Sequence, residues 1–369
     1  MGPALRHRVR YRRPEPSTEG LHVYRSFSEK LADPDLIDLG EGIYVLRFEV
    51  MKVASVRAAV QDLLDRGVVR PGQTLVDSSS GIYGHALALV CREFGLKCHI
   101  FASISVDAGI RTQLTYLGAT FQQVPSSASL KHDQEIRVRL VHKYLEANPD
   151  AYWMQQYHDD VHYLGYRGVA RTVVEELGVD GLTLVGGVGT GASTSGMGRY
   201  LREASPDVRV AGIQPFGSRS FGAESAPMDS FIIAGIGSGI RFANIDYRIY
   251  DTVHWLDFDV AAAGCRHLLA TTGVFAGLSG GAGWQVARYV RETEPAGGPV
   301  VFLAADPGHR YVELVYPVEA ADAPDPGYRP VRVSSLDDLA GPWATMDWAR
   351  RPFHVQDDLP EWRQVPRAA

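Results

Sequence analysis

Apolar and polar residues follow one another in blocks along this chain of 369 residues, with short apolar runs separated by longer amphipathic stretches. The runs Leu75–Asp77, Lys97–Ala102 and Thr120–Val124 have the length and composition of β-strands. Helical stretches separate these runs, and strands that alternate with helices are typical of parallel sheets. The pattern therefore predicts an α/β fold with parallel or mostly parallel sheets flanked by helices.

One apolar run ends in a glycine-rich turn that carries hydroxyl groups. The strand that begins at Leu182 leads into the turn Gly186–Gly196, and we expect a helix to follow. Backbone N–H groups, the hydroxyls of Thr190 and Ser193 and a helix N-terminus together suit a phosphate group. The turn therefore indicates a phosphate-binding loop, although a tight strand-to-helix turn that binds nothing would look similar.

Three kinds of phosphate site share this pattern. A nucleotide P-loop needs a Lys followed by Ser or Thr after its last glycine, and no such pair follows Gly191. A dinucleotide site fits Gly187–Ala192 in form, but it also needs an acid at the end of the next strand. That strand, expected at Val208–Ile213, is followed by Gln214 and Pro215. The abundance of Thr and Ser favours the third kind, a single phosphomonoester held by amides and hydroxyls.

A cofactor with one phosphate and an aldehyde also needs a lysine, and the chain has five. Lys52 differs from the others because its neighbours in Val50–Ala54 are apolar, at the start of a helix expected to run to Arg66. Apolar surroundings lower the pKa of an amine, which suits Schiff-base chemistry. A lysine whose stem covers apolar surface while its amine reaches water fits the local sequence equally well.

Together these residues resemble the fold type II pyridoxal-phosphate enzymes, in the branch of cysteine synthase and cystathionine β-synthase. The similarity runs from about Gly40 to about Tyr311. It is carried by Lys52, by the loop Gly189–Ser193 and by three further motifs in the family's order, Ser79–Gly84, Gly277–Ala282 and Asp306–Tyr311. One departure is Ile82, which stands where the family has an asparagine that hydrogen-bonds the ring hydroxyl of the cofactor.

The resemblance implies pyridoxal 5′-phosphate as cofactor and Lys52 as the catalytic residue that holds it as an internal aldimine. It implies that Ser279 faces the pyridine nitrogen, although the residues alone favour a helix cap at this serine. The implied cofactor-binding residues are Lys52, Gly189, Thr190, Gly191, Ala192, Ser193 and Ser279. The implied substrate-binding residues are Ser78, Ser79, Ser80, Gly81 and Gln156.

The resemblance further implies β-replacement or β-elimination on a β-substituted L-amino acid such as O-acetylserine or O-phosphoserine. Lys52 would remove the α-proton, an aminoacrylate intermediate would form, and a small nucleophile would add to give cysteine or a cysteine-like or diamino acid. Ile82 keeps open a second hypothesis, a catalytically inactive binding or regulatory protein with the same fold. A dinucleotide-dependent enzyme is a third and weaker hypothesis.

The length corresponds to two domains at roughly 150 residues each. We expect a larger phosphate-binding domain at 1–47 and 150–325, a smaller substrate-closing domain at 48–149, and the cofactor in the cleft between them. An aromatic C-terminal extension, 326–369, would follow. Because this extension holds Trp343, Trp348 and Trp362, we expect it to pack on the body or on a partner subunit.

Composition narrows the partners and the compartment. A net charge of −6 argues against nucleic acid, and no apolar stretch reaches the roughly 20 residues that span a membrane. Three cysteines fit a reducing cytoplasm without disulfides. The cluster His158–His162 lacks the spacing of a metal site, so we expect no metal. We expect a homodimer that takes small-molecule substrates.

Overall fold

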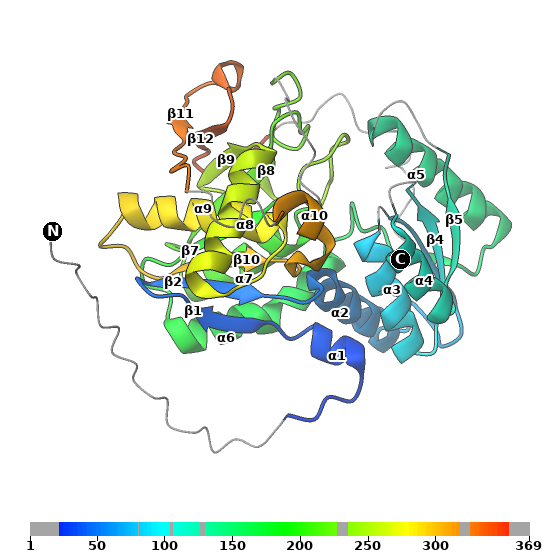
Figure 1. The fold of residues 1–369 in the computed structure, drawn as a ribbon. Coiled ribbons are helices and arrows are strands. Elements are labelled where there is room, and N and C mark those ends of the chain that lie inside the picture. The colour runs from blue at the N-terminus through cyan, green and yellow to red at the C-terminus, as the bar shows by residue number, and fades with distance from the viewer. Residues whose placement is uncertain are drawn as a thin grey trace, which may run out of the picture.

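The chain forms two sheets flanked by helices (Figure 1) in a computed structural model that describes residues 22–79, 81–103, 106–125, 130–226, 235–317 and 325–353. The larger sheet has the strand order β1-β2-β10-β7-β8-β9-β12-β11 and the smaller has the order β5-β4-β3-β6. The larger sheet comprises β1 (Asp35–Asp38), β2 (Ile43–Arg47), β7 (Thr183–Gly187), β8 (Arg209–Pro215), β9 (Thr252–Leu256), β10 (Val300–Ala304), β11 (Val331–Arg332) and β12 (Trp343–Asp347). The smaller comprises β3 (Thr74–Ser79), β4 (Lys97–Ala102), β5 (Thr120–Gln123) and β6 (Tyr152–Trp153).

Helices separate the successive strands from β2 to β10, as the alternation predicts, except that only a 3-10 helix lies between β8 and β9 among the described residues. The α-helices are α1 (Phe27–Leu31), α2 (Met51–Asp65), α3 (Ile82–Glu93), α4 (Ala108–Tyr116), α5 (Leu130–Ala147), α6 (Arg167–Leu177), α7 (Ala192–Ala204), α8 (Phe258–Thr272), α9 (Leu278–Thr293) and α10 (Val312–Val315). Short 3-10 helices lie at Asp160–Tyr166, Tyr247–Ile249, Gly308–Tyr311 and Leu336–Asp338.

Most strand pairs are parallel, which confirms the predicted fold class. The strands β2, β10, β7, β8 and β9 run in one direction, and β1 and β12 pair antiparallel with β2 and β9. The smaller sheet is parallel in all of its described pairs. β6 lies beyond residue 149, where we expect the smaller domain to end, and the domain bounds stay a prediction.

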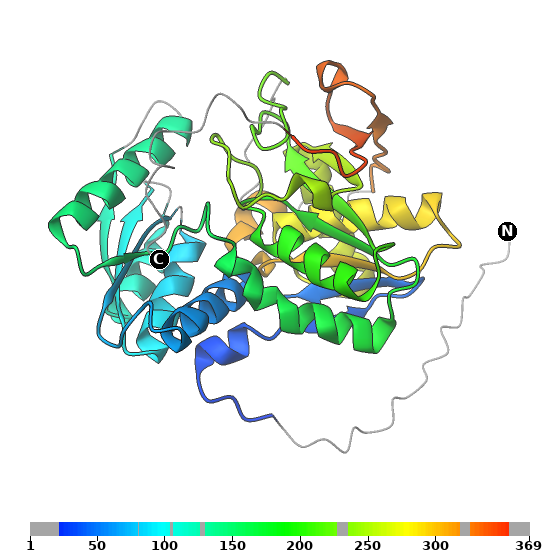
Figure 2. The same cartoon turned by 180° about the vertical axis from the view of Figure 1, so that it is seen from behind.

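Both faces of the larger sheet are apolar, because its strands carry consecutive apolar residues that point to opposite sides. Helices α8 and α9 lie on one face and α6 and α7 on the other (Figures 1 and 2). Val185 and Phe302 pack among residues of α8 and α9, and Leu184 and Val301 pack among residues of α6 and α7. In the smaller sheet, α5 covers one face, and α2, α3 and α4 belong to the core of the other.

The C-terminal extension packs on the body of the protein. β12 pairs with β9 over Trp343–Asp347, and the side chains of Trp343 and Trp348 are fully buried. The aromatic content predicts packing either on the body or on a partner subunit, and these contacts are with the body. Trp362 lies outside the described residues.

Among the described residues, no helix is both long and apolar enough to cross a membrane, and no three metal-binding side chains lie together. The cysteines, Cys91, Cys98 and Cys265, are buried free thiols.

Candidate active site

Most of the predicted site residues follow the carboxyl ends of parallel strands. Lys52 follows β2 and Gly189–Ser193 follow β7, and both strands run parallel to β10, which lies between them. In the smaller sheet, Ser78 and Ser79 end β3 and Gly81 caps the helix after it, and Gln156 follows the parallel strand β6. Parallel α/β sheets bind ligands at this edge. Ser80 lies outside the described residues.

Lys52 is the second residue of α2, and protein atoms surround much of its side chain. Burial lowers the pKa of its amine to about 8, although the carboxylates of Asp77 and Asp306 act in the opposite direction. The amine lies 6.0 Å from the ring centroid of Tyr83 and has no hydrogen bond or ion pair with any described residue. It is therefore a partly neutral amine, free to act as a nucleophile or a base.

Two acids border Lys52, of which Asp77 is fully buried and Asp306 is half-buried. Asp77, on β3, accepts hydrogen bonds from the backbone N–H of Ser78 at 2.7 Å and from Trp153 Nε1 at 3.1 Å. Asp306, which follows β10, accepts one from the hydroxyl of Tyr311 at 3.0 Å. Burial raises the pKa of each carboxyl group to about 6. Sequence reasoning missed a role for Asp77, for which the only signal is an acid at the end of an apolar run.

The phosphate loop leads into α7 through Gly191, whose φ of +89° is left-handed. A Cβ on Gly189 would lie 2.5 Å from the carbonyl oxygen of Gly235, and one on Gly191 would lie 2.5 Å from that of Asn244. No described residue accepts a hydrogen bond from the backbone N–H groups of 189–193 or pairs with the hydroxyls of Thr190 and Ser193. These donors remain available to an anion.

Ser279 is not the helix cap that its local sequence favours. Gly277 occupies the cap position of α9, and its N–H donates to the carbonyl oxygen of Asp306 at 2.9 Å. Ser279 is the second residue of the helix, and its hydroxyl has no partner among the described residues. The bond from Gly277 places the start of α9 beside Asp306, the acid that borders Lys52.

In the predicted substrate loop, some polar groups have hydrogen-bond partners within the protein and one has none among the described residues. The hydroxyl of Ser79 accepts hydrogen bonds from the N–H groups of Gly81 and Gly84, at 3.0 and 2.9 Å, and so helps to begin α3. The hydroxyl of Ser78 is buried and has no partner in the described part of the chain. The side-chain amide of Gln156 donates to the backbone oxygen of Ser78, so Gln156 and Ser78 lie together.

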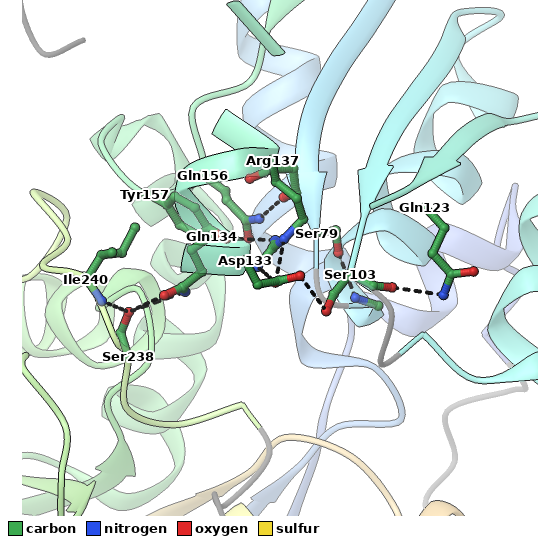
Figure 3. Close-up of polar contacts among 12 residues, drawn as sticks. Ser79, Ser103, Gln123, Asp133, Gln134, Arg137, Gln156, Tyr157, Ser238 and Ile240 are labelled. Carbon is green, nitrogen blue, oxygen red and sulfur yellow. Dashed lines mark hydrogen bonds and ion pairs between the residues drawn. The ribbon is translucent and has the colours of Figure 1, made fainter. Parts of the chain in front are cut away.

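Helix α5 connects this region to two loops through buried polar groups (Figure 3). Arg137 forms an ion pair with Asp133 at 2.8 Å, and its guanidinium donates to the hydroxyl of Tyr157 at 3.4 Å. Gln134 contacts the hydroxyl of Ser238 at 3.4 Å. Sequence reasoning missed this network, because the mixed charges of α5 look like those of a solvated helix.

Comparison with known proteins places these features in context. The family model described as "Pyridoxal-phosphate dependent enzyme" matches residues 48–306. Two curated proteins named N-(2-amino-2-carboxyethyl)-L-glutamate synthase, from Cupriavidus metallidurans and Ralstonia nicotianae, are 32% and 33% identical over 266 and 265 residues. Each alignment covers 70% of this chain and 76% of the relative.

Solved structures show the same fold. An O-acetylserine dependent cystathionine beta-synthase from Helicobacter pylori has a TM-score of 0.71 at 21% identity, over 80% of this chain and 100% of its own. An O-acetyl serine sulfhydrylase from Entamoeba histolytica has a TM-score of 0.70 at 19% identity, over 81% and 93%. At such identities the likeness concerns the fold.

Proposed function

The chain belongs to the pyridoxal-phosphate dependent enzyme family, and from this premise we propose that it is a β-replacement synthase. Its first substrate is a β-substituted L-serine such as O-acetylserine or O-phosphoserine. Its second substrate is an amino acid such as L-glutamate, which adds through its amino group. The product is then a diamino acid that carries a 2-amino-2-carboxyethyl group on nitrogen.

The curated relatives support this choice of nucleophile. Their name describes a 2-amino-2-carboxyethyl group joined to glutamate. That group is the three-carbon unit that a β-substituted serine leaves after it loses its substituent. The identity of 32% to 33% over most of the chain supports the same reaction class here.

The residues present fit pyridoxal 5′-phosphate. Lys52 would hold its aldehyde carbon, the free N–H groups and hydroxyls of Gly189–Ser193 would hold its phosphate, and the Ser279 hydroxyl would face its ring nitrogen. When bound, the cofactor withdraws electrons from the substrate's α-carbon and so makes the α-proton acidic. A hydroxyl leaves the ring nitrogen largely unprotonated, which favours loss of a β-substituent over transamination.

Lys52 supplies the base. With a pKa of about 8, roughly a quarter of such amines are neutral at pH 7.5. A neutral amine near the α-carbon takes the α-proton. Its positive charge then lies close to Asp77 and Asp306, whose carboxylates stabilise it.

The carboxylate of the substrate needs donors, and two lie together. Ser78 offers a buried hydroxyl without a described partner, and Gln156 has a second amide N–H besides the one that it donates to Ser78. A carboxylate between them would satisfy both groups. We further propose a homodimer in the cytoplasm as the working form.

The free, partly neutral amine of Lys52 is the single observation that carries this proposal. The test supplies the protein and its cofactor with ¹³C-labelled O-acetylserine or O-phosphoserine and ¹⁵N-labelled L-glutamate. One product that carries both labels in the mass spectrum supports the proposal. Labelled pyruvate and ammonia alone would show β-elimination, and cysteine formed only with added sulfide would show a cysteine synthase.

Two matched variants complete this experiment. Lys52→Ala should give no product and no cofactor covalently attached to the protein. Lys143→Ala, which removes an exposed lysine on α5, should behave as the native chain. Product formation by Lys52→Ala would refute the role of this lysine.

A further inference from the structure

Asn244 lies beside the loop that carries Gln156 and holds its backbone. The side-chain Nδ2 of Asn244 donates to the carbonyl oxygens of Gln156 at 3.0 Å and Asp159 at 2.9 Å. Its backbone N–H donates to the carbonyl oxygen of Tyr157 at 3.1 Å. Since Asn244 is 2% exposed, water does not compete for these three bonds.

The backbone of Asn244 also borders the phosphate loop. A Cβ on Gly191 would lie 2.5 Å from the Asn244 carbonyl oxygen and 2.8 Å from the Cα of Ile245, so the two backbones touch. The hydroxyl of Tyr163 donates to the same carbonyl oxygen at 2.5 Å. Close-packed interiors have little free space, so a shift of the loop at Gly191 must move residues 244 and 245.

Gln156 joins Asn244 to the smaller sheet through hydrogen bonds to two residues of β3. Its backbone N–H donates to the carboxylate of Asp77 at 3.0 Å, and its side-chain amide donates to the carbonyl oxygen of Ser78. A continuous set of buried contacts therefore joins Gly191, which follows β7, to Ser78 on β3. One end is the proposed phosphate site, and the other is the proposed carboxylate site.

We propose that Asn244 is a positioning residue: when an anion fills the phosphate loop, Asn244 holds Gln156 and Ser78 in the arrangement that binds substrate. This role rests on the proposed function of the phosphate loop and of the carboxylate site. Asparagine suits this role because its amide offers two N–H donors to two carbonyl oxygens. Aspartate offers only acceptors and would repel both. Coupling between sites is reciprocal, so a filled phosphate loop tightens substrate binding and bound substrate tightens the cofactor.

The first test uses inorganic phosphate as the probe of the loop. Amide hydrogen exchange in residues 155–163 is followed in the cofactor-free protein, with and without saturating phosphate, and in the holoenzyme. We expect phosphate and cofactor to slow this exchange by about tenfold in the native chain, a coupling of ordinary size. In Asn244→Asp we expect less than about a twofold change, although phosphate still binds.

The chain offers a matched control, because it contains only two asparagines. Asn148 is exposed, and its side chain donates to the carbonyl oxygen of Tyr144 within α5. Asn148→Asp makes the same chemical change away from both sites and should keep the native response. A native response in Asn244→Asp, or no response in the native chain to either phosphate or cofactor, overturns the proposal.

A second readout separates positioning from general loss of structure. Asn244→Asp should raise the KM for the β-substituted amino acid by about tenfold, while the Kd of the cofactor changes less than about threefold. A merely structural role would weaken cofactor binding to the same extent. If Asn244→Asp does not fold, Tyr163→Phe removes the hydrogen bond to the Asn244 carbonyl oxygen, together with a contact to the Ser195 hydroxyl, and should lose part of the coupling.

Failure of this inference and failure of the proposed function give different results. If the native enzyme forms no doubly labelled product but phosphate still slows exchange through Asn244, the β-replacement proposal fails and the coupling stands. If product forms and Asn244→Asp keeps the native exchange response and KM, the role of Asn244 is refuted.

Discussion

Acidification should destabilise the protein through one buried histidine, His254. This residue lies on β9 opposite Thr345 of β12 and is 2% exposed. Its Nδ1 accepts a hydrogen bond from Trp343 Nε1 at 3.3 Å, so the neutral ring carries its proton on Nε2, 3.4 Å from the hydroxyl of Thr345. Burial lowers the pKa of His254 from 6.5 to about 3.

The sign and size of the change in unfolding free energy follow from the number of protons that His254 binds in the native and in the unfolded chain. Well above pH 6.5 the imidazole is neutral in both the native and the unfolded chain, so His254 adds no pH dependence there. Between pH 6.5 and about 3 the unfolded chain binds a proton that the native chain does not, so the free energy of unfolding falls as the pH falls. At pH 5 this loss amounts to about 2 kcal/mol.

Urea unfolding at pH 7.5 and pH 5 tests this reasoning, with His254→Gln as the comparison. Glutamine offers both a donor group and an acceptor group but does not titrate. Other groups contribute to both chains alike, so the native chain should lose about 2 kcal/mol more than the variant between the two pH values. Equal losses in the two proteins would show that His254 is not held neutral by burial.

Three further predictions concern the site and the extension. In the cofactor-free protein, the rate at which Lys52 is acylated, followed by mass spectrometry, should reach half its maximum near pH 8, whereas an ordinary lysine does so near its pKa of about 10.4. A half-maximum near pH 10 would contradict the lowered pKa. Gly191→Ala should weaken cofactor binding at least about tenfold in a fluorescence titration, because Gly191 has a φ of +89° and the added methyl group would meet the backbone of Asn244. An unchanged Kd of the cofactor would argue against this loop as the phosphate site. Trp348→Ala, which removes a fully buried ring packed edge-to-face on Phe221, should cost about 3–5 kcal/mol of unfolding free energy, and a loss below 1 kcal/mol would contradict that packing.

Local pattern predicted much of the fold. The strand Lys97–Ala102 has the predicted bounds, because its apolar run ends where the sheet ends. β3 extends two residues beyond the predicted Asp77, since Ser78 and Ser79 pair with Phe101 and Ala102 despite their polar side chains. Polarity alone does not end a strand whose backbone finds a partner in the next strand.

The site was predictable only where a motif is continuous in sequence. Lys52 and the loop Gly189–Ser193 carry local signals, an isolated apolar lysine and a hydroxyl-rich glycine turn. Asn244 carries none, because its partner Gln156 lies 88 residues away. The helix cap that the residues alone favour at Ser279 is wrong, because α9 begins at Leu278 with Gly277 as its cap, and local residues do not show where a backbone turns.

The strand β12 has a consequence for how this protein is handled. It pairs along the whole of β9, which would otherwise be the last strand on that side of the larger sheet. A shortened chain that ends before Trp343 would expose the free hydrogen-bonding edge of β9 to other copies, and such edges promote aggregation. The extension therefore protects solubility, and expression of the enzyme should retain residues to at least Phe353.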